Sequence, residues 1–240
     1  MRALLLARRE WKVAFDTPIA YVVLGLFPAV TSAFFWLLGP FFDENVATMR
    51  RFFEILPLTL VIVGPALTMR LWSEERRGGT EEILFSFPLR IRDLVLGKFL
   101  GAWGLLGLAL ALTLGTPLSV AGLGDVDWGP VMGGYLGSML LGAACLAVGL
   151  WVSALTSNQI VAWLVGALVL LVFNLVGNAA FAESIPQGLG RALIQADFSF
   201  HFRSMAKGVV DIVDLVFYVG VTTFFLCLNG LALERRRWEG

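Results

Sequence analysis

The chain has 240 residues, of which 58% are hydrophobic and 15% charged, and its mean hydropathy is +0.81. A soluble domain of this length does not need so much apolar surface, so the composition excludes an ordinary soluble protein and predicts several membrane spans. The 18 basic and 18 acidic residues balance, which argues against a nucleic-acid partner.

Residues 1–16 predict an amphipathic helix that lies on the membrane surface. Leu4, Trp11 and Phe15 recur at helical spacing, and the basic residues of the segment lie largely apart from them. We expect the helix to end near Asp16, shortly before Pro18. The apolar start is too short for a signal peptide and no small-residue cleavage site follows it. A flexible basic leader is the alternative.

Two apolar runs follow, and both predict membrane spans. Residues 19–38 have about the length that crosses a ~30 Å hydrocarbon core at ~1.5 Å per residue. The second run, residues 53–71, contains Pro57 and Pro65. Each proline removes a backbone donor, so we expect this helix to be bent or to lean on its neighbours.

The next segment, residues 73–98, is a long charged stretch between two apolar runs. Lipid excludes such a stretch, so we expect it to lie in water or against a partner. Thr80 can cap a short helix whose first turn carries Glu81 and Glu82, and Pro88 ends it. The glycine pair before Thr80 allows a flexible start, and one apolar face would rest on the membrane domain.

Eight residues of this segment fit a pattern of permease subunits in the ABC-2 type transporter family, Glu-x3-Gly-Thr-x-Glu-x-Leu-x3-Pro-x8-Gly-Lys: Glu75, Gly79, Thr80, Glu82, Leu84, Pro88, Gly97 and Lys98. The chain therefore resembles this family. The resemblance implies a coupling helix that sits in a groove of a separate ABC ATPase subunit and passes its movement to the membrane helices. It assigns this ATPase-coupling role to Glu75, Gly79, Thr80, Glu82, Leu84, Pro88 and Lys98. An ordinary charged loop is the alternative.

Three further runs, residues 99–121, 130–155 and 160–181, predict the third to fifth spans. Glycines on the third and fourth leave smooth faces for close helix packing. Asn174 and Asn178 lie one turn apart on the fifth, and we favour interhelical hydrogen bonds over substrate contact for both.

The two cysteines, Cys145 and Cys227, both fall within apolar runs. We therefore expect small, buried packing residues, and neither a disulfide nor a metal pair.

Residues 183–214 are too polar for a normal span and too rich in Leu, Phe and Ile for a free loop. We expect an external or re-entrant amphipathic segment before a sixth span at residues 215–233. The end of this segment resembles one ABC-2 branch, that of gliding-motility-type and copper-enzyme-maturation-type permeases, through His201, Ser204, Gly208, Asp211 and Asp214.

A lone histidine without a cysteine or second histidine is a poor transition-metal site, so no metal ligand is assigned. We expect His201 to be a hydrogen-bonded structural residue, with an aspartate as its candidate partner.

The distribution of Lys and Arg predicts the orientation. If the N-terminus is cytoplasmic, thirteen of the 18 basic residues lie in cytoplasmic segments and the other five on the opposite side. The positive-inside rule then places both termini and residues 73–98 in the cytoplasm, and the protein in the inner (cytoplasmic) membrane.

The sequence lacks the Gly-x4-Gly-Lys-Ser/Thr phosphate loop, so no catalytic residue or cofactor is assigned to this chain; a partner ATPase would bind ATP and magnesium. We predict one all-α, six-span ABC-2 type transmembrane domain, residues 1–240. It would act as an export permease, as a homodimer or with a related permease, together with the ABC ATPase subunit.

Two alternatives stay open. One is a non-transporting mechanotransmitter that contacts an external partner protein through residues 183–210. The other, an ion-driven transporter or channel, would usually carry ionisable groups within its spans, and the predicted spans carry essentially none.

Overall fold

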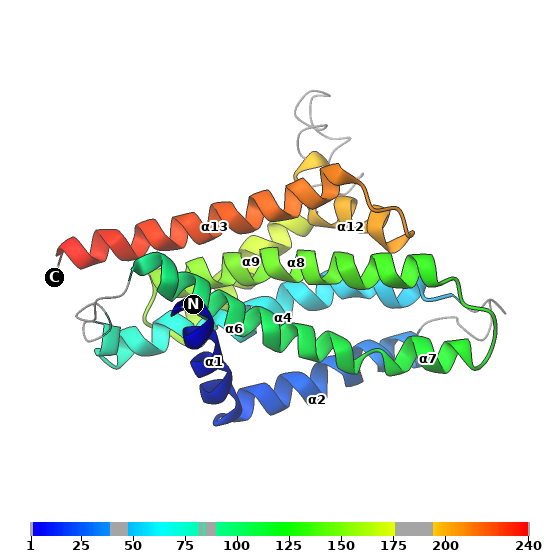
Figure 1. The fold of residues 1–240 in the computed structure, drawn as a ribbon, viewed down its shortest axis with the longest axis horizontal. Helices are drawn as coiled ribbons and strands as arrows, with labels where there is room; N and C mark the ends of the chain where they lie inside the picture. Colours follow the sequence, from blue (N-terminus) through cyan, green and yellow to red (C-terminus); the bar gives the residue numbers. More distant parts are fainter. Residues whose placement is uncertain (1, 39–47, 82–83, 85–89, 176–193, 240) are drawn as a thin grey trace.

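The computed structural model describes residues 2–38, 48–81, 84, 90–175 and 194–239, and these ranges are largely helical (Figure 1). The elements follow in this order: α1 (Arg2–Phe15), α2 (Pro18–Ala33) with η1 (Phe34–Leu38), α4 (Arg50–Arg77), α6 (Ile91–Leu112), α7 (Gly115–Ala121), α8 (Trp128–Leu155), α9 (Gln159–Leu175), α12 (Phe198–Ala206) and α13 (Ile212–Glu239).

Within the described residues, five stretches are long and apolar enough to cross a membrane: Pro18–Leu37, Arg50–Arg77, Ile91–Ala121, Trp128–Leu155 and Ile212–Arg237. This confirms an all-α, multi-pass membrane fold. The described part of α9 is apolar but has 17 residues, shorter than the five. The fifth span was predicted at residues 160–181, and its end lies outside the described residues. A count of six spans therefore stays a prediction.

Helix α8 forms the centre of the bundle and packs most extensively against α4 and α13. In the most apolar 18-residue stretch of α8, 78% is buried inside the protein. The corresponding stretches of α2 and α13 are only 22% buried. The outward faces of α2 and α13 are apolar, as expected for helices that meet lipid.

Helix α4 leans on α8 and α9 through its second proline, as expected from the sequence. A Cβ added at Gly166 of α9 would lie 3.1 Å from Cβ of Pro65, and one added at Gly149 of α8 would lie 3.0 Å from Cα of Pro65. Ser153 of α8 donates a 2.9 Å hydrogen bond to the carbonyl of Met69 in α4. Small residues thus let the backbones approach, and a hydroxyl joins them.

Helices α4 and α13 are longer than the apolar runs that predicted them, and α6 begins before its run. Helix α4 continues to Arg77 and α6 begins at Ile91, so both ends of the charged segment 73–98 are helical and only residues 78–90 connect the two helices. Charges end a hydrophobic run but do not end a helix, which explains the difference.

The prediction for the cysteines is half correct. Cys145 is buried at the centre of α8, whereas Cys227 is exposed on α13. A thiol is apolar enough to face lipid, so its place in an apolar run does not show which way it points.

Candidate functional site

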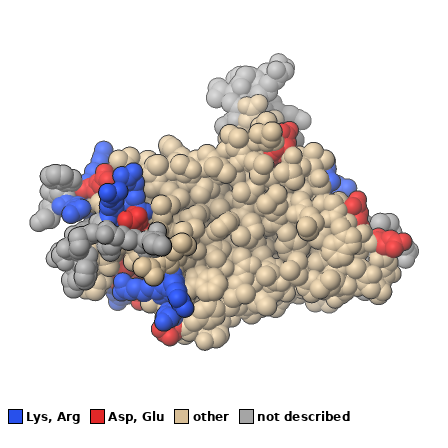
Figure 2. Space-filling view, in the orientation of Figure 1, with Lys and Arg blue, Asp and Glu red and all other residues tan. Residues whose placement is uncertain are grey.

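Charged side chains gather at the two ends of the elongated molecule and leave a broad uncharged middle in the view of Figure 2. The end that holds the C-terminus of α13 carries a dense group of Lys, Arg, Asp and Glu. At this end α1 packs against α6, and the last turns of α4 lie close by. The residues of the ABC-2 pattern that the structure describes lie here.

Lys98 of α6 occupies the centre of this charged end, and its side chain is only 4% exposed. Its Nζ lies 2.7 Å from Oε1 of Glu75 in α4 and 3.3 Å from Oε1 of Glu10 in α1. The ammonium group also lies 4.8 Å from the ring centroid of Trp72, within cation–π range. One lysine therefore joins three helices; we call Lys98, Glu10 and Glu75 the lysine cluster.

Burial of an unpaired ammonium group would be very unfavourable, and the two carboxylates offset this cost. The arrangement depends on all members, because removal of one partner from a buried ion pair leaves an uncompensated charge. Oε2 of Glu75 is also buried and has no hydrogen-bond partner among the described residues.

Glycines of α6 that face α1 let the two helices pack closely. A Cβ added at Gly97 would lie 2.5 Å from Cβ of Leu6, and one added at Gly101 would lie 2.8 Å from Cβ of Glu10, so both positions require glycine at this approach. Nε1 of Trp11 donates a 2.8 Å hydrogen bond to the carbonyl of Gly101. The amphipathic helix predicted for residues 1–16 is present, and this contact brings Glu10 to Lys98.

Gly79, the second residue after α4, has a φ of +67°, which lies in the left-handed region that favours glycine. The hydroxyl of Thr80 donates a 3.1 Å hydrogen bond back to the carbonyl of Glu75, at the end of α4. The sequence predicted that Thr80 caps a helix that starts just after it. The backbone N–H groups that such a cap would bind belong to residues that the structure does not describe. Oε1 of Glu81 lies 4.0 Å from Nη1 of Arg236 in α13.

Leu84 is partly buried and packs against the core. It lines a small hollow together with Leu6, Leu94 and the lysine cluster. Glu82 and Pro88, the remaining residues of the predicted ATPase-coupling set, lie outside the described residues.

His201 links α12 to α13 toward the other end of the bundle. Its Nδ1 lies 2.6 Å from Oδ1 of Asp214, and its Nε2 donates a 3.0 Å hydrogen bond to the carbonyl of Gln195. The ring stacks on Phe217 with centroids 4.0 Å apart. His201 is therefore the hydrogen-bonded structural residue that we expected, and Asp214 is its partner.

The other members of the set that the sequence predicts to be external shape the chain around α12. Gly208 has a φ of +83°, and a Cβ added there would lie 2.9 Å from the backbone of Gly129 at the start of α8. Oδ1 of Asp211 accepts a 3.1 Å hydrogen bond from the backbone N–H of Val213, at the start of α13. The hydroxyl of Ser204 donates a 3.5 Å hydrogen bond to the carbonyl of Val209.

Helix α12 is capped and tied to its neighbours. Asp197 accepts a 2.9 Å hydrogen bond from the backbone N–H of Ser199, and burial raises the pKa of its carboxyl although this bond and Arg203 act against the rise. Oδ1 of Asn174 in α9 accepts a 3.2 Å hydrogen bond from the hydroxyl of Ser199. Asn174 thus makes the interhelical bond that we favoured, while Asn178 lies outside the description.

The sequence profile of the ABC-2 family transporter proteins matches residues 13–232, which is most of the chain. The chain belongs to the ABC-2 family. A comparison with functionally curated proteins finds no match. The narrower likeness to the gliding-motility and copper-enzyme-maturation branch stays a prediction.

In this ABC-2 protein the structure brings Glu75, Leu84 and Lys98 together at one end of the bundle. His201 and Asp214 form a second, separate group. Among the described residues, no three His, Cys, Asp or Glu side chains gather as a metal site. Both nitrogens of His201 already have partners within the protein.

Sequence reasoning missed Glu10 and Trp72 as partners of Lys98. A signal for Glu10 exists, because it is the single acidic residue of α1, a helix that is otherwise basic on its polar side. Trp72 carries no such signal, since an aromatic residue near the end of a span is common at membrane interfaces.

Proposed function

We propose that this ABC-2 protein is the permease subunit of an ABC transporter, and that a separate ATPase subunit supplies the energy for export or other conformational work. The lysine cluster is the observation that supports the proposal most. It joins α4 and α6, the two helices that flank residues 78–90, and adds α1 to them. A movement imposed on residues 78–90 would therefore act on three helices together.

Further contacts would carry this movement into the bundle. Nη1 of Arg76 donates a 3.0 Å hydrogen bond to the carbonyl of Leu155 at the end of α8, and Glu81 approaches Arg236 of α13. Since α8 packs along α4 and α13, a tilt of α4 would move the centre of the bundle. The ATPase must bind the two conformations of the membrane domain with unequal affinity. Otherwise its nucleotide cycle would not change the balance between them.

The complete transporter would contain two such membrane domains, either a homodimer or a pair with a related permease, and two ATPase subunits that bind ATP and magnesium. The outward apolar faces of α2 and α13 are available for lipid or for the second membrane domain. Both termini and residues 78–90 would lie in the cytoplasm, where the ATPase is found.

The first test is affinity purification of the tagged protein from its native membranes, with mass spectrometry and an ATPase assay. We expect a soluble phosphate-loop ATPase to copurify, and Glu82→Lys to reduce its recovery or its stimulated activity by at least about tenfold, as the loss of a charged contact does. Asp125→Lys, the same charge reversal at the exposed loop before α8, should leave both unchanged.

Recovery of an ATPase-free oligomer would contradict the proposal and favour a channel or passive carrier. If the ATPase does copurify, reconstitution into vesicles separates two forms of the function. Movement of a solute identifies a transporter, and nucleotide-dependent conformational change without solute movement identifies a mechanotransmitter.

A further inference from the structure

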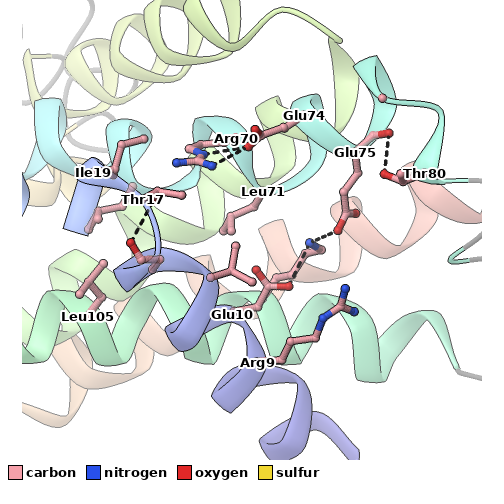
Figure 3. A pocket seen from close by; sticks show the side chains of 15 residues that line it. Arg9, Glu10, Thr17, Ile19, Arg70, Leu71, Glu74, Glu75, Thr80 and Leu105 are labelled. Carbon is pink, nitrogen blue, oxygen red and sulfur yellow. Dashed lines mark hydrogen bonds and ion pairs between the residues drawn. The ribbon is translucent and has the colours of Figure 1, made fainter. Parts of the chain in front are cut away.

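A cavity of about 390 Å³ lies beside the lysine cluster, between α1, α2, α4 and α6 (Figure 3). Val13 and Ala14 of α1, Ile19 of α2, and Leu67 and Leu105 of α4 and α6 give it apolar walls. The charged residues of the lysine cluster, together with Arg9, Arg70 and Glu74, line the rest.

The lining changes from apolar to charged along α4. Leu67 and Leu71 are followed by Glu74, Glu75 and then Gly78, and Arg70, which lies between the two leucines in sequence, pairs with Glu74 at the charged end. Eleven residues of helix correspond to about 16 Å at ~1.5 Å per residue. This length and this order of chemistry match the upper part of a membrane phospholipid, in which an acyl chain leads to glycerol and then to a charged headgroup.

A position of α1 on the membrane surface, as the sequence predicts, would place the cavity at the depth of the headgroups. One side of α1 rests on α6, while Leu4 and Leu5 are 66% and 68% exposed, as expected for an amphipathic helix in the interface. The cavity is lined by this helix and by the charged end of α4, so a lipid of the same leaflet would meet it beside α1.

One cation at the cavity, Arg9, forms no ion pair with the described residues, although its charge acts on the nearby carboxylate of Glu75. Arg70 pairs with Glu74 at 2.8 Å, and Lys98 pairs with both of its carboxylates. Arg9 is exposed and lines the cavity, and among the described residues it forms no ion pair. A guanidinium group with free donors is well suited to a phosphate, which it can bind through two parallel hydrogen bonds.

We propose that the cavity binds a glycerophospholipid of the adjoining leaflet, with its phosphate on Arg9 and an acyl chain along the wall formed by Val13, Ile19 and Leu67. Gly78 and Thr80, at the start of the connection to α6, also line the cavity. The bound lipid therefore stabilises α1 against the base of residues 78–90. This site does not depend on the ATPase.

Native mass spectrometry of the full chain in detergent, titrated with phosphatidylethanolamine, tests the proposal. We expect one lipid to bind preferentially, and Arg9→Ala to weaken it about tenfold, as the loss of a charge-assisted hydrogen bond does. Arg8→Ala is the matched control, because Arg8 is an exposed neighbour that does not line the cavity. Diacylglycerol with the same acyl chains lacks the phosphate and should bind at least about tenfold more weakly.

Equal losses for Arg8→Ala and Arg9→Ala, or equal binding of diacylglycerol, would overturn the proposal. A second pair of variants tests the walls without changing charge. Val13→Trp places a larger ring in the lining and should abolish the preferential binding, whereas Leu5→Trp, on the exposed side of α1, should not. Val13 is itself 44% exposed, so the larger ring does not disturb the core. Undiminished binding by Val13→Trp would place the lipid elsewhere and reject the site.

Discussion

Lys98 shows how one residue can hold separate elements together. Lys98→Met keeps the aliphatic stem but leaves Glu10 and Glu75 without their cation. We expect a loss of about 3 kcal/mol of stability, the typical effect of breaking a buried ion pair. Thermal unfolding in detergent, followed by tryptophan fluorescence, measures it.

Glu10→Gln and Glu75→Gln, added to Lys98→Met, remove the uncompensated charges and should recover much of the lost stability. If the triple variant is no more stable than Lys98→Met alone, the loss comes from packing of the lysine stem and the cluster does not act through its charges.

The His201 pair makes a second prediction at the scale of the residue. Nε2 faces a carbonyl, which only accepts, so Nε2 carries a hydrogen. The 2.6 Å contact between Nδ1 and Asp214 needs a hydrogen between the two atoms. Asp214→Asn can supply it from its amide and should be tolerated, whereas Asp214→Ala leaves a buried ring nitrogen unpaired and should cost about 1–3 kcal/mol.

The same thermal unfolding assay compares these two variants. Equal destabilisation by Asp214→Asn and Asp214→Ala would show that the pair needs the charge of the aspartate, and not only a hydrogen between the two side chains.

At the scale of the element, the contact between α1 and α6 depends on glycines. Gly97→Ala places a methyl group within 2.5 Å of Cβ of Leu6, so α1 must move away from α6. Overpacking of this kind typically costs about 1–3 kcal/mol. Gly25→Ala is the control: a Cβ at Gly25 of α2 meets nothing within 4 Å, and alanine there should be neutral or slightly stabilising.

The unfolding temperatures of the two variants provide the measurement, and a cysteine cross-link between α1 and α6 reports whether the helices separate. An unchanged cross-link and unfolding temperature in Gly97→Ala would show that α1 is not seated as the structure describes.

The elements themselves could largely be predicted from the sequence. Apolar runs mark the spans, because every backbone group in lipid must be paired within a helix. Their ends could not be predicted, because α4 continues past its apolar run to Arg77 and α6 begins at Ile91, before the run at residues 99–121. The sequence also did not show which side of a helix faces lipid, as the exposed Cys227 illustrates.

At the scale of the whole molecule, the contacts of the candidate site could not be predicted. Glu10 and Lys98 are 88 positions apart, and their meeting depends on how α1 packs against α6. The family pattern indicated Glu75 and Lys98 but not that they form an ion pair. The pairing of His201 with Asp214 was easier to anticipate, since the two lie only 13 positions apart in consecutive helices.

The orientation of the whole molecule provides the last prediction. The loop before α8 and the C-terminus of α13 lie at opposite ends of the bundle (Figure 1). In a background without Cys145 and Cys227, a membrane-impermeant maleimide should label Asp125→Cys in intact cells, and Glu234→Cys only after permeabilisation. The excess of basic residues at the end that carries the lysine cluster is the physical reason, because Lys and Arg are retained in the cytoplasm. The opposite pattern would place residues 78–90 outside the cell, where no ATPase could reach them, and would reject the proposed coupling.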